Sequence, residues 1–329
     1  MSLHTPLCDL LGIEHPVVQA PIGTAACPGL AAAVSNAGGL GTLALSWTPL
    51  DRIASVVAET RSLTERPFGV NLVLPWDQRE RLERALEAGA PVVSLAWGEP
   101  APYAEAAHAA GATVIAAAAS AEEARCAVAA GADAVVAQGW EAGGHVLGTV
   151  STLALVPPVV DAVAPVPVIA AGGIGDGRGL AAVLVLGAAG AMLGTRFLLA
   201  EETPIHPEYR DRLLAACETD TVYSTLFDVG WPDAPHRTLR NSTVEAWEAA
   251  GRPPSGSRPG EGEPIALRAD GGPIVRYSAA LPLTGAGGEI EALSLWAGQS
   301  VALANSVRPA GEIVREIVAA AVAALERLR

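Results

Sequence analysis

The chain contains no lysine, because all 21 of its basic side chains are arginine. Schiff-base aldolases and lysine-linked pyridoxal phosphate enzymes both need a primary amine, so these two classes are excluded. The four cysteines are scattered, with no C-x-x-C pair and no histidine at ligand spacing: Cys8, Cys27, Cys126 and Cys217. We therefore expect reduced thiols and neither a disulfide framework nor a zinc site.

Positive charge is also scarce, since 35 acidic residues give a formal net charge of −14. Nucleic-acid binding needs clustered cations, so we expect no such partner. The longest apolar run, residues 180–193, is interrupted by Gly187 and Gly190 and is shorter than the ~18 residues of a membrane span. The short, mixed N-terminus shows no targeting segment. We expect a cytoplasmic protein without a membrane partner, and a homodimer is one open option for its assembly.

Short apolar runs alternate with helix-compatible stretches through the first two thirds of the chain. Eight runs are typical of buried parallel strands: 17–20, 40–44, 68–73, 92–95, 113–117, 134–137, 168–170 and 191–194. Helices are favoured between them, as at 50–60, 77–88, 121–130, 152–163 and 177–186. This alternation predicts an α/β fold, a (β/α)₈ TIM barrel.

A three-residue phrase with a central glycine stands just before four of these strands, at 88–90, 110–112, 130–132 and 186–188. Glycine there ends the preceding helix in the left-handed conformation and lets the chain turn into the sheet. The repeat indicates equivalent units around a barrel. A doubly wound open sheet is the alternative, although no G-x-G-x-x-G fingerprint follows the first strand.

The alternation stops near His206, and the turn-rich stretch that follows lasts to about Trp296. We interpret 206–296 as a smaller inserted α+β segment, a lid or substrate domain that covers the barrel mouth. Residues 1–205 and 297–329 would form the barrel. Within the latter, 297–307 and 310–328 are expected to be helices that complete the outer ring.

Barrel enzymes place their sites on loops after the carboxyl ends of the strands. The residues found there form no metal-binding cluster and offer no nucleophile beside a base, so the chemistry must come from a bound cofactor. The loops after the seventh and eighth strands, where barrels usually bind phosphate, are rich in glycine. Backbone N–H groups at Gly172, Gly173 and Gly194 would cradle a phosphate, and tight turns alone are the other interpretation.

His145 is the one histidine that the sequence places at a strand end, whereas the other five lie at termini, on helices or in the insert. An imidazole with an ordinary pKa of ~6.5 accepts a proton at neutral pH, so we predict that His145 is the catalytic acid/base residue. Glu141 in the same loop has either a chemical role or a role in ordering the loop through backbone hydrogen bonds.

Several segments in combination resemble the nitronate monooxygenase (2-nitropropane dioxygenase-like) family. They are 19–21 (QAP), 31–41 (AAAVSNAGGLG), 67–71 (PFGVN), 138–145 (QGWEAGGH), 170–174 (AAGGI) and 194–197 (GTRF), with 297–300 (AGQS) near the end. The resemblance covers nearly all of residues 13–202. The chain departs from the family pattern in two segments, since Val146 and Leu147 follow the histidine and alanines occupy 116–118.

The resemblance implies an FMN-dependent oxidoreductase on a TIM barrel, acting on small molecules. FMN contacts would come from Asn71, Gln138, Gly143, Gly144, Gly173, Met192, Leu193, Gly194 and Thr195. The backbone of Ala20, Pro21 and Ile22 would face the flavin ring, and His145 would serve as general base. The implied reaction is the oxidation of an alkyl nitronate by oxygen to a carbonyl compound and nitrite, through one-electron flavin chemistry.

Two other classes of function stay open. The phrase EAGGH also occurs in flavin-dependent enoyl-acyl-carrier-protein reductases, which take hydride from a nicotinamide cofactor, and an NAD(P)H:quinone reductase on the same scaffold is related to them. A barrel that binds flavin or a phosphorylated ligand only as a sensor or partner protein is the third hypothesis.

Overall fold

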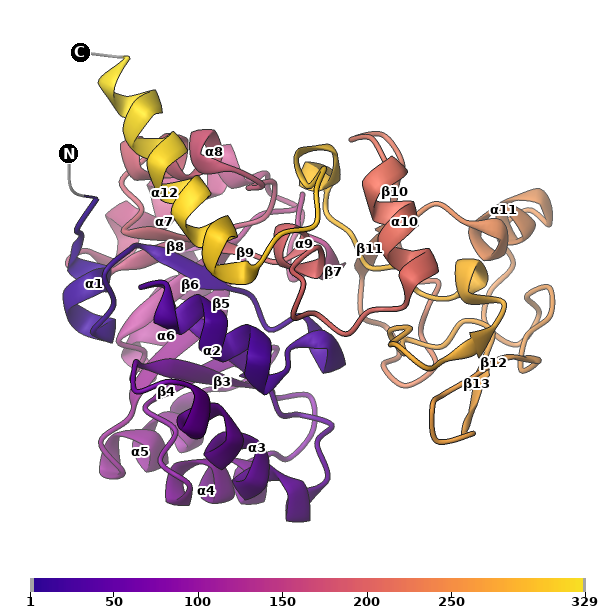
Figure 1. Cartoon of the computed structure of the whole chain (residues 1–329), viewed down its shortest axis with the longest axis horizontal. Helices are drawn as coiled ribbons and strands as arrows, with labels where there is room; N and C mark the ends of the chain where they lie inside the picture. The colour runs from indigo at the N-terminus through magenta and orange to yellow at the C-terminus, as the bar shows by residue number, and fades with distance from the viewer. Residues whose placement is uncertain (1–2, 328–329) are drawn as a thin grey trace.

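The computed structural model describes residues 3–327, in which eight parallel strands form one sheet surrounded by helices (Figure 1). The strands are β1 (Val17–Gln19), β2 (Gly41–Ala44), β3 (Phe68–Val73), β4 (Val92–Ala96), β5 (Thr113–Ala118), β6 (Ala134–Gln138), β8 (Val168–Ala171) and β9 (Gly190–Leu193). Their order, β1-β9-β8-β6-β5-β4-β3-β2, places the first two strands at the two ends of the ladder. All eight predicted strands are confirmed.

Hydrogen bonds between β1 and the start of β2 close the ladder into a barrel. Val18 bridges Leu40 in parallel, and the N–H of Leu40 donates to the carbonyl of Val17 at 2.9 Å. The fully buried side chain of Gln19 adds to this seam, since its Oε1 accepts from the N–H of Thr42 at 2.8 Å. The predicted TIM barrel is therefore confirmed, and the open doubly wound sheet is wrong.

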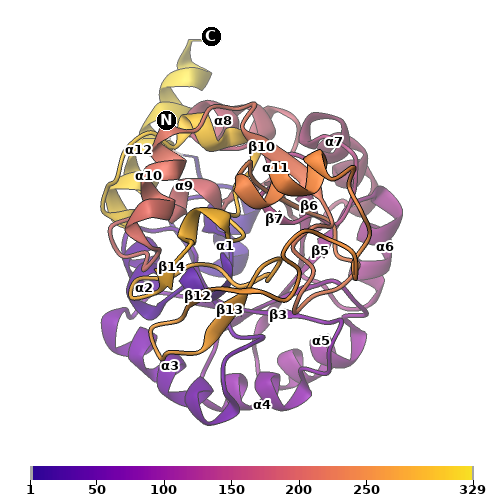
Figure 2. The ribbon, with the colours of Figure 1, turned by 90° about the vertical axis from the view of Figure 1, so that its right-hand side faces the viewer.

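Helices cover the outside of the barrel (Figure 2). They are α2 (Pro28–Asn36), α3 (Leu50–Leu63), α4 (Arg79–Glu87), α5 (Ala101–Ala109), α6 (Ala121–Ala129), α7 (Thr152–Val163), α8 (Gly177–Val185) and α12 (Ala310–Glu326). The short α1 (Pro6–Leu11) buries Leu7 and Leu11 against the barrel interior, beside Val18 and Ile169. It thus closes one end of the barrel and leaves the other end for a site.

The repeated glycines end helices as the sequence predicts. Gly89, Gly111, Gly131 and Gly187 have φ angles of 86°, 78°, 100° and 96°, in the left-handed region that favours glycine. Each lies directly between a helix and the next strand. Equivalent αβ units around the barrel are confirmed by this shared geometry.

Residues 206–296 fold into short elements outside the barrel, on the side away from both termini (Figure 1). They comprise α10 (Pro207–Ala215), β10 (Thr221–Ser224), β11 (His236–Leu239), α11 (Ser242–Ala249), β12 (Pro264–Leu267), β13 (Pro273–Val275), β14 (Gly287–Gly288) and a 3₁₀ turn, Ile290–Ala292. A short strand in a barrel loop, β7 (Gly144–His145), pairs antiparallel with β11 and joins this segment to the barrel. β12 and β13 lie across the front of the barrel in Figure 2.

The helix expected at 297–307 is wrong, because the only helical element there is a 3₁₀ turn, Gln299–Leu303. The N–H of Gly298 donates to Thr195 Oγ1 at 3.0 Å, and that of Gln299 donates to the carbonyl of Glu141 at 3.0 Å. These contacts hold the backbone against the barrel loops, and Pro309 ends the segment. The C-terminal helix expected at 310–328 is confirmed as α12, which ends at Glu326 and buries Ile313 and Ile317, and residue 328 lies outside the described residues.

Gly177 shows how closely α12 approaches α8. A Cβ atom at Gly177 would lie 2.3 Å from the carbonyl oxygen of Ile317, so only glycine fits there. None of the helices within residues 3–327 has the length and apolar composition needed to cross a membrane.

Candidate active site

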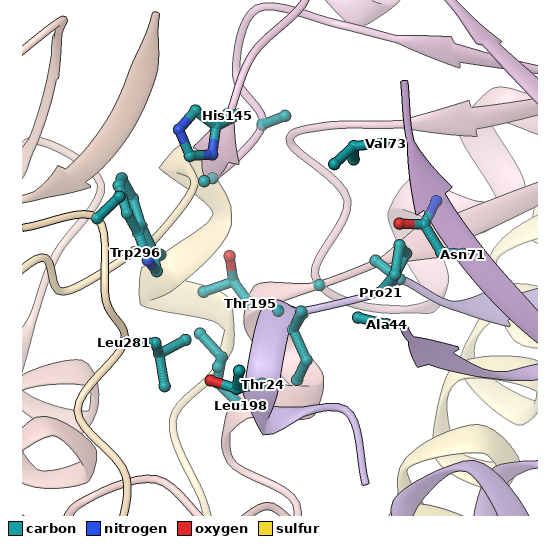
Figure 3. A pocket seen from close by; sticks show the side chains of 18 of the residues that line it. Pro21, Thr24, Ala44, Asn71, Val73, His145, Thr195, Leu198, Leu281 and Trp296 are labelled. Atoms are coloured by element: carbon teal, nitrogen blue, oxygen red, sulfur yellow. The ribbon is translucent and has the colours of Figure 1, made fainter. Parts of the chain in front are cut away.

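A cavity of about 940 Å³ opens at the carboxyl ends of the barrel strands, between the strand-end loops and residues 206–296 (Figure 3). Small side chains such as Ala44, Ala96, Ala117 and Ala171 line it from the strands. Short side chains at these positions leave room above the barrel core. This volume lies near the upper end of the usual ~300–1,000 Å³ range for small-molecule and cofactor sites.

Glycine backbone forms the wall of the cavity after β6, β8 and β9. Gly172 and Gly173 have φ angles of 97° and 70°, which a residue with a side chain rarely adopts. A Cβ at Gly172 would lie 2.8 Å from the carbonyl oxygen of Gly139, and one at Gly143 would lie 2.4 Å from the nitrogen of Gly298. The loops therefore pack backbone against backbone along this wall.

Three polar side chains that line the cavity also form hydrogen bonds to the backbone around it. Asn71 donates to the carbonyl of Ser94 at 3.1 Å. Gln138 donates to the carbonyl of His145 at 3.2 Å and accepts from the N–H of Leu147 at 2.8 Å. Thr195 accepts from Gly298, so all three fix backbone around the cavity while lining it.

The structure brings almost every predicted site residue to this one cavity. Those that line it are Ala20, Pro21, Ile22, Asn71, Gln138, Gly143, Gly144, His145, Gly172, Gly173, Met192, Gly194 and Thr195. Leu193 is the exception, because its side chain is buried in the core with Val17 and Phe197. Neighbouring strand residues face opposite sides, so Met192 lines the cavity and Leu193 points away from it.

His145 lies among aromatic rings at the cavity wall. Its ring stacks on Trp231 with centroids 3.9 Å apart and lies 5.2 Å from the ring of Trp296. Nε2 is buried without a hydrogen-bond partner, although the residue as a whole lines the cavity. Burial, with a smaller contribution from His236, lowers the pKa of His145 to about 3. The imidazole is therefore neutral throughout the physiological range.

The ring of His236 packs against that of His145, and the imidazole of His236 is also neutral. The two residues pair across β11 and β7, with ring centroids 5.6 Å apart. Nε2 of His236 accepts from the N–H of Phe227 at 3.1 Å, so Nδ1 carries the proton and donates to the carbonyl of Ala234 at 2.9 Å. Burial lowers the pKa of His236 to about 4.

The fully buried His236 is expected to make the fold sensitive to acid. Its pKa is about 4 in the folded chain and ~6.5 when unfolded, so between these values only the unfolded chain takes up the proton. His236 alone lowers the free energy of unfolding by about 1.4 kcal/mol per pH unit below pH ~6.5, and the buried His145 adds a similar slope. Urea unfolding from pH 7 to 5 should therefore show a loss of stability, and in a His236→Gln variant the slope should be shallower by about 1.4 kcal/mol per pH unit. Equal slopes in the two proteins would contradict the assignment.

Glu141 orders the loop, as one of its two sequence interpretations predicted. Its carboxylate accepts from the N–H of Thr152 at 2.9 Å and from Thr152 Oγ1 at 3.1 Å, at the first residue of α7. Negative charge at a helix N-terminus is stabilising. The contact fixes the segment between Glu141 and α7, which includes His145.

Of the four tryptophans that line the cavity, the sequence placed only Trp97 among the strand-end residues where a site was expected, and it missed the other three. Trp47, Trp97, Trp231 and Trp296 all line it, although aromatic residues make up only 4% of the chain. A signal was present, since Trp47, Trp76 and Trp97 each follow a different strand, β2, β3 and β4, within three residues. No sequence feature linked Trp231 and Trp296, far along the chain, to the same place.

Comparison with known proteins places this architecture in a family. The family model described as nitronate monooxygenase matches residues 4–80 and 76–320. The nitronate monooxygenase of Paraburkholderia phytofirmans is 34% identical, over 98% of this chain and 96% of that protein. A protein of Mycobacterium tuberculosis is 44% identical over 77% of this chain and 70% of its own length, and it is called (3aS,4S,5R,7aS)-5-hydroxy-7a-methyl-1-oxo-octahydro-1H-indene-4-carboxyl-CoA dehydrogenase.

Two solved structures resemble the whole chain. FabK from Thermotoga maritima superposes with a TM-score of 0.83 at 34% identity, covering 99% of this chain and 98% of that one. Nitroalkane oxidase from Streptomyces ansochromogenes gives a TM-score of 0.79 at 31% identity, covering 98% and 99%.

Fold, site and relatives together define a TIM-barrel oxidoreductase that acts on small molecules. More particularly, the chain belongs to the nitronate monooxygenase family. Membership implies a flavin cofactor.

Proposed function

We propose that this protein is an FMN-dependent nitronate monooxygenase that oxidises alkyl nitronates with oxygen. Two nitronate anions and one O₂ would give two carbonyl compounds and two nitrite ions, which balances atoms and charge. One observation supports the proposal most strongly: His145, a neutral histidine, lines the same cavity as the glycine-rich loops. The two relatives named for nitronate and nitroalkane chemistry add support.

The residues of the cavity fit FMN. Backbone N–H groups in the loops of Gly172, Gly173 and Gly194 suit the phosphate, since bare amides bind an anion without lysine. Asn71 and Gln138 offer amides to the polar edge of a flavin, and the Ala20–Ile22 backbone offers a face to its ring. When bound, the flavin supplies the redox chemistry.

His145 would bind the nitronate and orient it. Nε2 is buried with no acceptor within reach, so we assign the proton to Nδ1. An Nδ1–H group donates to the oxygen of an anionic nitronate, which needs no proton removed. The surrounding Trp231 and Trp296 exclude water from this hydrogen bond and strengthen it.

Residues 206–296 would serve as the lid or substrate domain, beside a barrel of 1–205 and 297–329. Support comes from the residues of this segment that line the cavity, including Trp231, Ile274 and Leu281. A cytoplasmic location and a homodimeric state stay hypotheses, which cell fractionation and sedimentation would test.

Anaerobic mixing tests the proposed reaction against its rivals. The flavin of the purified holoprotein should be bleached by ethyl nitronate, and admission of air should release nitrite. Bleaching by NADH or NADPH with no response to the nitronate would overturn the proposal in favour of a reductase.

Dehydrogenation of an acyl thioester is the second candidate. The observation that favours it is the 44% identity to the carboxyl-CoA dehydrogenase of Mycobacterium tuberculosis, against 34% to the nitronate monooxygenase described above. Flavin bleaching by a hydroxyacyl-CoA, without any by nitronates, would select this candidate.

Gly194 offers a direct test of the cofactor site. A methyl group there would be in ordinary contact with Ala20 and Ile22, at 3.5 Å, so the protein itself tolerates alanine. The methyl would, however, enter the space assigned to the FMN phosphate. Gly194→Ala should therefore weaken FMN binding about five- to hundredfold, as measured by titrating the apoprotein.

Gly29 in α2 is the matched control, since a Cβ atom added there would have nothing within 4 Å and the residue is outside the cavity. Gly29→Ala should bind FMN like the parent protein. An unchanged FMN affinity in Gly194→Ala would place the phosphate elsewhere.

A further inference from the structure

Four tryptophans form a cluster beside His145, which we call the tryptophan wall. Trp231 is its centre, with ring centroids 5.7 Å from Trp47, 5.2 Å from Trp76 and 5.2 Å from Trp97. Trp231 also stacks on His145 at 3.9 Å. The wall therefore joins the loops after β2, β3 and β4 to residues 206–296 and to the histidine.

The wall is left partly uncovered. Trp47 is 47% exposed and Trp76 37% exposed, whereas Trp231 is only 6% exposed. Trp47, Trp97 and Trp231 line the cavity, and Trp76 does not. Indole rings that line a cavity offer flat apolar faces against which a bound ligand can pack.

The backbone of Trp97 is held in a strained conformation. Its φ angle of 66° lies in the left-handed region, which a bulky side chain seldom adopts. The next residue, Gly98, packs so closely that a Cβ there would lie 2.6 Å from Cβ of Leu74. Such strain persists where the surroundings impose it and is common at functional sites. Here it accompanies an indole that lines the cavity.

The lining that residues 206–296 contribute is largely aliphatic as well. It includes Val229, Ile274, Leu281 and Leu283, with Arg268 and Asp270 at a hairpin turn as its charged members. A ligand body placed here meets apolar groups from both the barrel and the segment. A small nitronate would leave most of this apolar lining exposed to water.

We propose that the tryptophan wall selects substrates that carry a flat or cyclic apolar ring, with the ring packed on Trp47 and Trp97 and the reacting group at His145. This inference rests on the proposed function and names its substrate class. Stacking on indole contributes beyond simple burial, whereas a short alkyl chain gains little from a flat face. Ring-bearing nitronates are thus bound more tightly than short-chain ones.

Binding of unreactive probes tests this separately from turnover. Nitrobenzene and 2-methyl-2-nitropropane both lack a hydrogen on the nitro-bearing carbon, so neither forms a nitronate. Calorimetric titration of the holoprotein should show that Trp47→Leu weakens nitrobenzene binding about three- to tenfold. Binding of 2-methyl-2-nitropropane should change less than about twofold. Equal losses for both probes, or no loss for either, would overturn the inference.

Trp76→Leu is the matched control, because Trp76 is also exposed and contacts Trp231 but does not line the cavity. It should leave nitrobenzene affinity unchanged, and a loss equal to that of Trp47→Leu would reject a direct contact. Trp97→Gly is a second variant, since glycine accepts the φ of 66° while the ring is removed. It should weaken nitrobenzene binding as Trp47→Leu does, and unchanged binding would contradict the inference.

Kinetics separates failure of this inference from failure of the proposed function. The nitronate of phenylnitromethane should have a lower KM than ethyl nitronate, and Trp47→Leu should raise only the former. If neither nitronate is oxidised, the proposed function fails while the binding result for nitrobenzene still decides the inference about the wall. If both are oxidised with equal KM, the wall does not select rings.

Discussion

Replacing His145 by leucine is expected to lower kcat/KM for alkyl nitronates by about 10²–10³-fold while the flavin stays bound. Loss of one hydrogen-bond donor to a charge in a water-excluded site typically has an effect of this size. Leucine is apolar and fits a ring environment made by Trp231 and Trp296. Oxygen uptake gives the rate, and the visible spectrum of the same sample gives the flavin content.

The matched variant His145→Gln keeps an N–H donor and should retain more activity than His145→Leu. It holds no titratable proton, so partial rescue would show that donation to the substrate matters more than base strength. Nitronate oxidation at the parental rate in His145→Leu would remove His145 from the mechanism.

A strong preference for nitronates over neutral nitroalkanes is the second large effect that we expect. Burial lowers the pKa of His145 from 6.5 to about 3, which makes the ring a poor acceptor for a carbon-bound proton. General-base catalysis usually increases the rate of proton transfer by at least ~10²-fold, and a base this weak would lose most of that increase. At pH 7, kcat/KM for ethyl nitronate should exceed that for nitroethane by about 10²-fold or more.

The pH profile provides the check on this preference. Because His145 is neutral above pH ~3, nitronate oxidation should show no inflection near the ordinary histidine value of ~6.5. Rapid oxidation of nitroethane, with a rate that declines below pH ~6.5, would instead show a histidine that works as a base at its usual pKa.

The barrel could be predicted from sequence because its signals are local. Each strand is a short apolar run of its own, and glycines such as Gly89 and Gly187 mark helix ends through a backbone conformation that other residues avoid. The glycine-rich loops after the seventh and eighth strands were expected at the site from their position in the fold, and Gly172 and Gly194 lie on the cavity. The side chain of Leu193 lies in the core and not on the cavity, because a range of consecutive strand residues includes both faces of the strand.

The features of the site that the sequence did not predict depend on contacts between distant parts of the chain. Trp231 stacks on His145 because β7 pairs with β11, which lies far along the chain. No local sequence pattern predicts that pairing. The low pKa of His145 follows from the same burial, so a base of ordinary strength was expected where the structure has a weak one. The 3₁₀ turn at Gln299–Leu303 likewise depends on contacts with Thr195 and Glu141.

We propose above that FMN, held by the glycine loops after β6, β8 and β9, performs the redox chemistry in this cavity. The most direct test of this proposal is the visible absorption spectrum of the purified protein, followed by mass identification of the chromophore released on denaturation. We expect a flavin spectrum and the mass of FMN, with about one FMN molecule per protein chain after reconstitution. A colourless protein that cannot be reconstituted with FMN would contradict it.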